Sequence, residues 1–89
     1  LAILYKEEYH DYLESIKIYT EGIQYNPNVS VLYYNRACCY ALMENKEAAL
    51  EDLIIANQLS PSLLEYMEKD DELVQVRQMP AYQNAFSVK

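Results

Sequence analysis

The side chains that could carry out chemistry in this chain are few and poorly placed to act together. The adjacent pair Cys38–Cys39 has no histidine on a shared helical face, so we expect no activated thiolate. The single histidine, His10, has no cysteine or carboxylate at the spacing of metal ligands. The acidic pairs Glu7–Glu8 and Asp70–Asp71 are each adjacent rather than opposed across a site, which does not suit acid–base catalysis. We therefore predict a protein that is not an enzyme and that holds no metal.

These residues have simpler structural interpretations. We expect His10 to lie in a solvated turn and both cysteines to be small, buried or half-buried apolar residues. Gly22 is the only glycine, so there is no glycine-rich loop to cradle a phosphate, and we expect no cofactor. Two neighbouring cysteines cannot build a disulfide framework, which favours a reducing, cytoplasmic location.

The charge balance indicates the kind of partner. The 89 residues make one small domain with 14 acidic and 7 basic residues, a net charge of −7. This charge repels phosphate backbones and favours a basic peptide or protein face, so we expect no nucleic-acid partner. No uninterrupted apolar run approaches the ~20 residues of a membrane span, and we expect no membrane partner. Because the chain begins with Leu1 rather than Met, we interpret it as part of a longer protein.

The elements that would position any site are predicted to be helices. Apolar residues recur at helical spacing, and Pro27, Pro61 and Pro80 interrupt the pattern. Ser30 is a suitable N-cap for the third helix, and Pro61 suits a place at or near the first position of the fifth helix. We expect turns at 10–11 and 44–45 and a break near 69–71. The predicted helices cover residues 1–9, 12–25, 31–43, 46–59, 62–78 and 81–86.

The strongest pattern is an internal repeat with a period of 34 residues. Pro27 recurs as Pro61, and small or large apolar residues occupy matching places before each proline. A fixed period of this length is typical of stacked helical hairpins, each unable to bury its apolar face alone. The other matching pairs are Asp11 and Asn45, Ser15 and Ala49, Ile16 and Leu50, Tyr19 and Leu53, Gly22 and Ala56, and Tyr25 and Leu59.

The second unit, residues 29–62, resembles a tetratricopeptide repeat. The matching positions are Tyr33, Ala37, Tyr40, Ala49, Leu53, Ala56 and Pro61, and Arg36 replaces the usual leucine of the family. Residues 1–28 match only in their second half, at Ser15, Tyr19, Gly22 and Pro27. Residues 63–89 follow the pattern least: Asp70 and Asp71 fall at the places of Arg36 and Ala37, so we expect a degenerate cap.

The resemblance implies an all-α superhelix, a solenoid of antiparallel helix hairpins whose first helices line a concave groove. Tyr33, Ala37 and Tyr40 would form the packing face, together with Tyr12 and Tyr19. The opposite face would bind a peptide. Its predicted groove residues are Glu8, Tyr34, Asn35, Cys38, Leu42, Glu65 and Lys69.

The segment from Val31 to Tyr40 is similar to repeats that hold the acidic tails of chaperones, where an asparagine at the place of Asn35 binds the peptide carboxylate. Its companions there are a second asparagine and a basic pair, and this chain has Leu4, Glu65 and Lys69 at those places. Because only part of that ligand set is kept, we do not expect capture of an acidic tail. Asn35 is more simply explained by bonds to backbone or water.

We therefore predict a protein–protein interaction module or scaffold that docks a basic or amphipathic segment in its concave groove. Tyr34 and Leu42 would supply apolar contact and Asn35 polar orientation, with acidic residues steering the partner. The alternative is a self-associating structural end of a larger array, a homo-oligomer formed through the apolar edge Leu1–Leu4.

Overall fold

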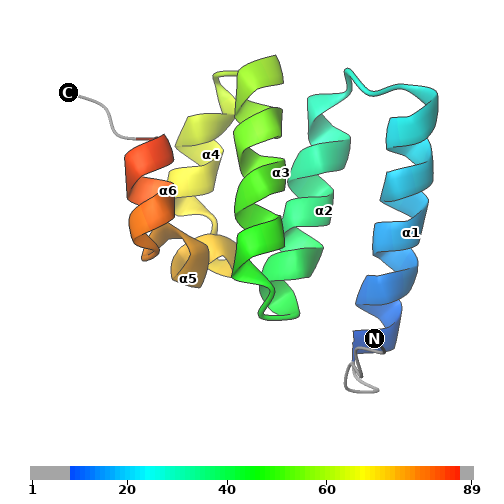
Figure 1. Cartoon of the computed structure of the whole chain (residues 1–89), viewed down its shortest axis with the longest axis horizontal. Coiled ribbons are helices and arrows are strands. Elements are labelled where there is room, and N and C mark those ends of the chain that lie inside the picture. The colour runs from blue at the N-terminus through cyan, green and yellow to red at the C-terminus, as the bar shows by residue number, and fades with distance from the viewer. Residues whose placement is uncertain (1–8, 87–89) are drawn as a thin grey trace.

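The computed structural model describes residues 9–86, and within that range the regular elements are all helices (Figure 1). The described residues contain no strand, so the all-α class is confirmed. The elements are α1 (His10–Tyr25), α2 (Ser30–Leu42), α3 (Lys46–Leu59), α4 (Leu63–Lys69), the 3₁₀ turn η2 (Asp71–Leu73), α5 (Val74–Arg77) and α6 (Pro80–Ala85).

The three long helices lie side by side in chain order and run alternately up and down (Figure 1). α2 packs against both α1 and α3, and it also contacts η2. The short elements lie beside α3, on the side away from α1, with α4 and α5 against it. α3 is thus covered from two sides, whereas α2 is the main neighbour of α1 among the described elements.

The predicted boundary of the fourth helix is confirmed, because α3 runs from Lys46 to Leu59. Its start is capped by the side chain of Asn45, which accepts a hydrogen bond from the Ala48 N–H at 3.4 Å. The predicted cap at Ser30 is wrong. Ser30 is the first residue of α2, and the preceding Val29 makes no side-chain cap bond.

The predicted turn at residues 10–11 is also wrong, because α1 begins at His10. No proline or glycine interrupts the chain there, and Asp11 in the first turn suits the positive end of the helix dipole. The predicted helix over residues 1–9 lies outside the described residues, apart from Tyr9.

The predicted break near residues 69–71 is confirmed. α4 ends at Lys69, and the Asp70 side chain caps η2 by accepting the Glu72 N–H at 2.9 Å. Pro61 lies near the start of the next helix as predicted, two residues before α4 begins. Pro80 is the first residue of α6, a position where its missing N–H costs nothing.

The core lies where the small residues of α2 and α3 let the helices approach closely. Ala37, Ala49, Leu53 and Ala56 have no exposed surface, and Tyr33 is buried as predicted. Tyr12, Tyr19 and Tyr40, which were expected to share that role, are only half-buried. The cap completes the core with Met67, Leu73, Val76 and Tyr82. None of the described helices is long and apolar enough to span a membrane.

Candidate functional site

The predicted binding residue Tyr34 is half-buried, and its hydroxyl forms a hydrogen bond within the chain. Its hydroxyl donates a 2.7 Å hydrogen bond to Oδ2 of Asp70, which joins α2 to the start of η2. Burial raises the pKa of Tyr34, and the hydrogen bond to the Asp70 carboxylate raises it further. This contact joins the cap to α2 and gives Tyr34 a structural role, while its predicted binding role stays a prediction.

The thiol of Cys38 lies in the same place. It is half-buried, and its Sγ lies 3.8 Å from Oδ2 of Asp70. Burial raises the pKa of Cys38, and the negative charges of Asp70 and Glu72 raise it further. A thiol that resists deprotonation is a poor nucleophile. The packing role expected from the sequence therefore fits, with two carboxylate neighbours that the sequence did not predict.

Cys38, Asp70 and Glu72 form a possible ligand set for a metal ion, because one ligand atom from each lies within 4.8 Å of the others. A thiolate with two carboxylates could suit a zinc-like ion. However, Asp70 already accepts hydrogen bonds from the Tyr34 hydroxyl and from the Glu72 N–H. These bonds give the cluster a structural explanation.

A shallow groove of about 240 Å³ opens between the end of α2 and the η2–α5 segment. Its lining combines apolar side chains with three carboxylates. The lining residues are Ala41, Leu42, Glu44, Asp71, Glu72, Val74 and Gln75. No described residue forms an ion pair with any of the three carboxylates, and the last turn of α2 has no basic residue. The groove therefore brings three carboxylates together beside apolar side chains.

Glu44 has an unusual backbone conformation at the edge of this groove. Its φ of 65° lies in the left-handed region, and it is the one non-glycine residue with positive φ in the described part of the chain. Glycine is the usual residue just beyond a helix end in this conformation. The Glu44 carboxylate accepts a 2.8 Å hydrogen bond from the Tyr9 hydroxyl. A strained residue that carries a charge is a feature of functional sites.

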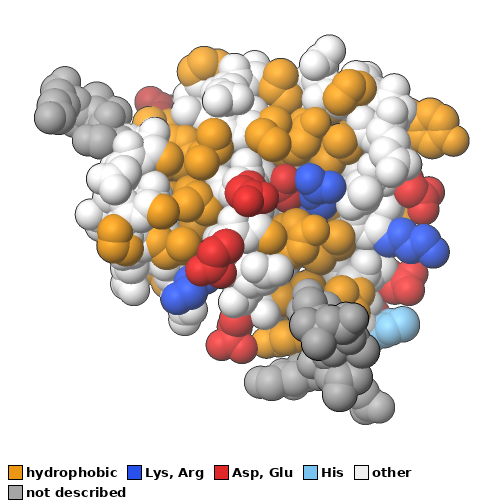
Figure 2. All heavy atoms as spheres, viewed as in Figure 1, with side chains coloured by type: hydrophobic (Ala, Val, Ile, Leu, Met, Phe, Trp, Pro, Cys, Tyr) orange, Lys and Arg blue, Asp and Glu red, His pale blue; other side chains and the backbone are white. Residues whose placement is uncertain are grey.

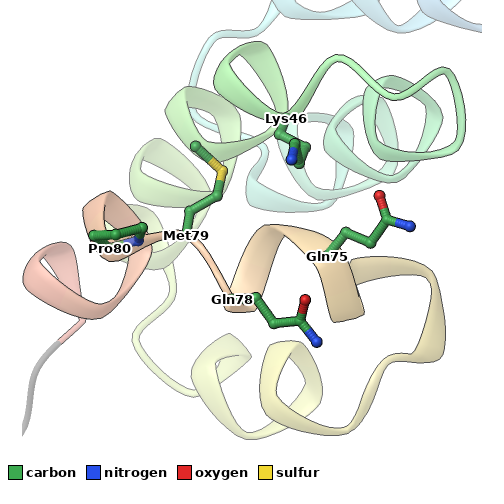
Figure 3. A pocket seen from close by; sticks show the side chains of 5 residues that line it. All are labelled: Lys46, Gln75, Gln78, Met79 and Pro80. Atoms are coloured by element: carbon green, nitrogen blue, oxygen red, sulfur yellow. The ribbon is translucent and has the colours of Figure 1, made fainter.

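A second hollow, of about 390 Å³, adjoins the groove and shares Gln75 with it. Figure 3 shows Lys46, at the start of α3, facing the segment that contains Gln78, Met79 and Pro80. One ammonium group and two amides line this hollow, so it is not acidic like the groove. Because only the groove is lined by carboxylates, the groove is the hollow that would select a basic ligand over an acidic one.

The structure brings together only part of the predicted site. Leu42 lines the groove, while Tyr34 and Cys38 meet at Asp70. Asn35 is half-buried on α2, and Glu65 and Lys69 are exposed on α4 and do not line the groove. Glu8 and the predicted self-association edge lie outside the described residues.

Sequence reasoning missed the roles of Glu44, Asp71, Val74 and Gln75. Asp71 was expected to lie in an irregular cap. Its place near the end of α2 depends on the path of the chain after α4, which the sequence pattern does not predict. Glu44 was assigned to a turn, and no local pattern marks its positive φ.

Arg36 also has a role that its sequence position did not reveal. Its Nε and Nη2 donate to the two carboxylate oxygens of Asp52, each at 2.7 Å, and its Nη1 donates to Thr20 Oγ1 at 3.1 Å. The Asp52 hydrogen bonds raise the pKa of Arg36 above its ordinary value. The guanidinium thus links α1, α2 and α3.

Large apolar side chains are also exposed at scattered places. On the face shown in Figure 2, hydrophobic groups gather along the seams between helices, with acidic groups among them. The most exposed are Tyr25 at 92% and Ile18 and Tyr66 at 66% each. Ile18 and Tyr25 both lie on α1, which among the described elements packs mainly against α2.

No protein-family model and no solved structure matches this chain.

Proposed function

We propose that this chain is a tetratricopeptide-type module that binds a basic segment of another protein and carries out no catalysis. The 34-residue repeat, the all-helical fold and the antiparallel course of α1 to α3 support this family assignment. The net charge of −7 supports a basic partner, which it would attract over long range.

The observation that carries the proposal is the acidic groove between α2 and α5. A lysine or arginine side chain combines an apolar stem with a cationic head. The stem would lie on Leu42 and Val74, and the head would reach the carboxylates of Glu44, Asp71 and Glu72. Charge-assisted hydrogen bonds to carboxylates are about twice as strong as neutral ones. The groove thus has the chemistry that one long basic side chain requires.

The size of the groove supports a single side chain rather than a small-molecule ligand. Its volume of about 240 Å³ is below the roughly 300–1,000 Å³ that is usual for small-molecule sites. Binding through so small a contact would be weak, with a Kd on the order of micromolar or above. The partner segment would gain affinity from contacts on the neighbouring apolar surface.

A pair of labelled peptides tests the proposal. The probe is a fluorescent pentapeptide, Ala-Leu-Arg-Leu-Ala, and its twin carries Glu in place of Arg. Fluorescence anisotropy with the whole chain is expected to show binding of the arginine peptide alone. Affinity should fall severalfold between about 50 mM and about 500 mM salt, because these charges are exposed to screening.

Variants then locate the binding site. The double variant Asp71→Asn/Glu72→Gln should weaken binding about tenfold, since two of the three charges are lost. Glu65→Gln is the matched control, because Glu65 is exposed and acidic but does not line the groove. Equal loss in the control, or equal binding of both peptides, would reject the groove as the site.

A further inference from the structure

The acidic groove and the second hollow adjoin each other, and Gln75 lines both of them. The charges of their linings are opposite. The groove is lined by the carboxylates of Glu44, Asp71 and Glu72, whereas Lys46 is the one charged residue among the described residues that line the second hollow. A ligand that entered both hollows would therefore meet carboxylates at one end and an ammonium group at the other.

The Lys46 ammonium group offers a place for an anion. Lys46 is half-buried at the start of α3, and no residue that the structure describes forms an ion pair with it. Figure 3 shows the Lys46 side chain on one side of the hollow and the side chains of Gln75 and Gln78 on the other. An amide NH₂ group donates hydrogen bonds, so both glutamines can join Lys46 in binding a carboxylate.

Gln75 suits the boundary between the two hollows because an amide can serve ligands of either charge. Its NH₂ group can donate to an acid beside Lys46, while its carbonyl oxygen can accept from a cation in the groove. Apolar side chains on each side of this boundary, Val74 in the groove and Met79 in the hollow, can contact the stems of the two ligand side chains.

We propose that the partner segment carries an acidic side chain two residues from its basic one, so that the basic side chain enters the acidic groove and the acidic side chain enters the hollow beside Lys46. Side chains two residues apart in an extended peptide point the same way and are about 6–7 Å apart, which suits two adjoining hollows. The inference rests on the proposed function, because it takes the groove as the site of the basic side chain. The partner is then a segment with a pair of opposite charges rather than a run of basic residues.

A partner matches the two hollows better than the chain's own residues 1–8 do. Those residues precede α1, which packs mainly against α2, whereas the Lys46 hollow lies between α3 and the cap (Figure 1). Their one basic residue, Lys6, is followed by Glu7 and Glu8. They would bring two carboxylates to hollows that already hold three carboxylates and one ammonium group. A partner with a single acidic residue matches the single ammonium group.

The test uses fluorescent pentapeptides whose ends are blocked, so that no terminal charge contributes. Each is based on Ala-Leu-Arg-Leu-Ala, and glutamate replaces either the first or the last alanine, two residues before or after the arginine. Each glutamate peptide has a twin with glutamine in the same place. Fluorescence anisotropy with the whole chain should show at least one glutamate peptide binding about threefold more tightly than its twin. The net charge of −7 alone would favour the neutral twin.

Variants of the chain assign this preference to Lys46. Lys46→Gln should remove the preference without weakening binding of the glutamine twin, and Lys46→Glu should reverse the preference. Lys17→Gln is the matched control, because it removes the same charge from an exposed lysine of α1 that lines neither hollow, and it should keep the preference. All three variants should keep the far-ultraviolet circular dichroism spectrum of the unchanged chain.

The outcomes separate this inference from the proposed function. If the arginine peptides bind and Asp71→Asn/Glu72→Gln weakens them, but the glutamate and glutamine twins bind alike, the inference fails and the proposed function stands. If no arginine peptide binds, both fail. A preference for glutamate that survives Lys46→Gln would also overturn the inference. Tighter binding of every peptide by the variant Lys6→Gln/Glu8→Gln would overturn it too, because the chain's own residues would then be the occupant.

Discussion

Arg36 and Asp52 face each other across α2 and α3 in a two-pronged ion pair, with both hydrogen bonds at 2.7 Å. The Asp52 side chain is 4% exposed and that of Arg36 is 17% exposed, so the carboxylate has almost no water to replace its partner. The pair lies beside the fully buried alanines of the same two helices. It therefore fixes the relative position of α2 and α3 as well as joining them.

Removing one partner of this pair should be costly. Arg36→Leu leaves the Asp52 carboxylate buried without its cation, and we expect a loss of about 3 kcal/mol in the free energy of unfolding. The double variant Arg36→Leu/Asp52→Leu should recover most of that loss, because no unpaired charge remains. Urea unfolding followed by circular dichroism measures both. A double variant no more stable than the single one would show that the pair contributes through something other than charge.

The Tyr34–Asp70 contact predicts an effect on the cap. Tyr34→Phe keeps the ring and removes the hydroxyl that donates to Asp70, so we expect a loss of about 1–2 kcal/mol in unfolding free energy. Tyr66→Phe is the matched control, since Tyr66 is 66% exposed on α4. Hydrogen exchange should show faster exchange in η2 and α5 for the first variant alone. Unchanged hydrogen exchange in η2 and α5 would contradict the inference that the Tyr34–Asp70 bond holds the cap against α2.

Stability should fall at alkaline pH. The pKa values of Cys38, Tyr34 and Tyr82 are all raised in the folded chain, from ordinary values of 9.0 for the thiol and 10.0 for the phenols. Groups that hold their protons more tightly when folded stabilise the fold fully below those ordinary values, and deprotonation then favours unfolding. Urea unfolding should show no loss from this source up to about pH 8 and a steep decline above pH 9.

Variants assign that alkaline decline to particular groups. Cys38→Ala should flatten its first part, and Tyr34→Phe should flatten the part above pH 10. The hydrogen bonds to Asp52 raise the pKa of Arg36, so Arg36 stays charged over this pH range. The Arg36–Asp52 ion pair should therefore not contribute to the alkaline loss of stability. If both variants lost stability at alkaline pH just as the unchanged chain does, the loss would belong to other titrating groups.

Much of the helical pattern was predictable because its signals are local. Proline at 27, 61 and 80 and polar turn residues at 44–45 mark the ends of helices whatever the rest of the chain does. The turn expected at His10 failed because nothing there prevents a helix from forming. Ala37, Ala49 and Ala56 were identified as matching positions of the repeat, and all three are fully buried.

The candidate site was less predictable because its residues are distant in sequence. Tyr34 and Asp70 are separated by 36 positions, and their contact depends on the irregular path of the cap after Lys69. Asp71 and Val74 reach the groove by the same path. A periodic pattern predicts where a regular repeat would place a residue, but the cap departs from the repeat at this point.

Replacing Glu44 with glycine should have opposite effects on stability and on binding. Glu44→Gly places glycine at a φ of 65°, which relieves backbone strain, and should stabilise the chain by about 0.5–1 kcal/mol despite the loss of the Tyr9 hydrogen bond. The same change removes one of the three groove carboxylates and should weaken binding of the arginine pentapeptide severalfold. Thermal unfolding and anisotropy measure the two effects. Weaker binding with lower stability would point to a damaged fold instead.

The difference in burial between the two repeat units can be tested with one pair of substitutions. Ala49 has no exposed surface, so Ala49→Glu buries a carboxylate without a partner, at a cost of several kcal/mol, comparable to the whole stability of a small domain. Ser15 holds the matching place in α1 but is only half-buried, so Ser15→Glu can turn its charge to water and should cost about 1 kcal/mol or less. Circular dichroism should show an unfolded Ala49→Glu chain and a helical Ser15→Glu chain. A helical, soluble Ala49→Glu chain would contradict the tight contact between α2 and α3, and equal losses would contradict the looser packing around Ser15.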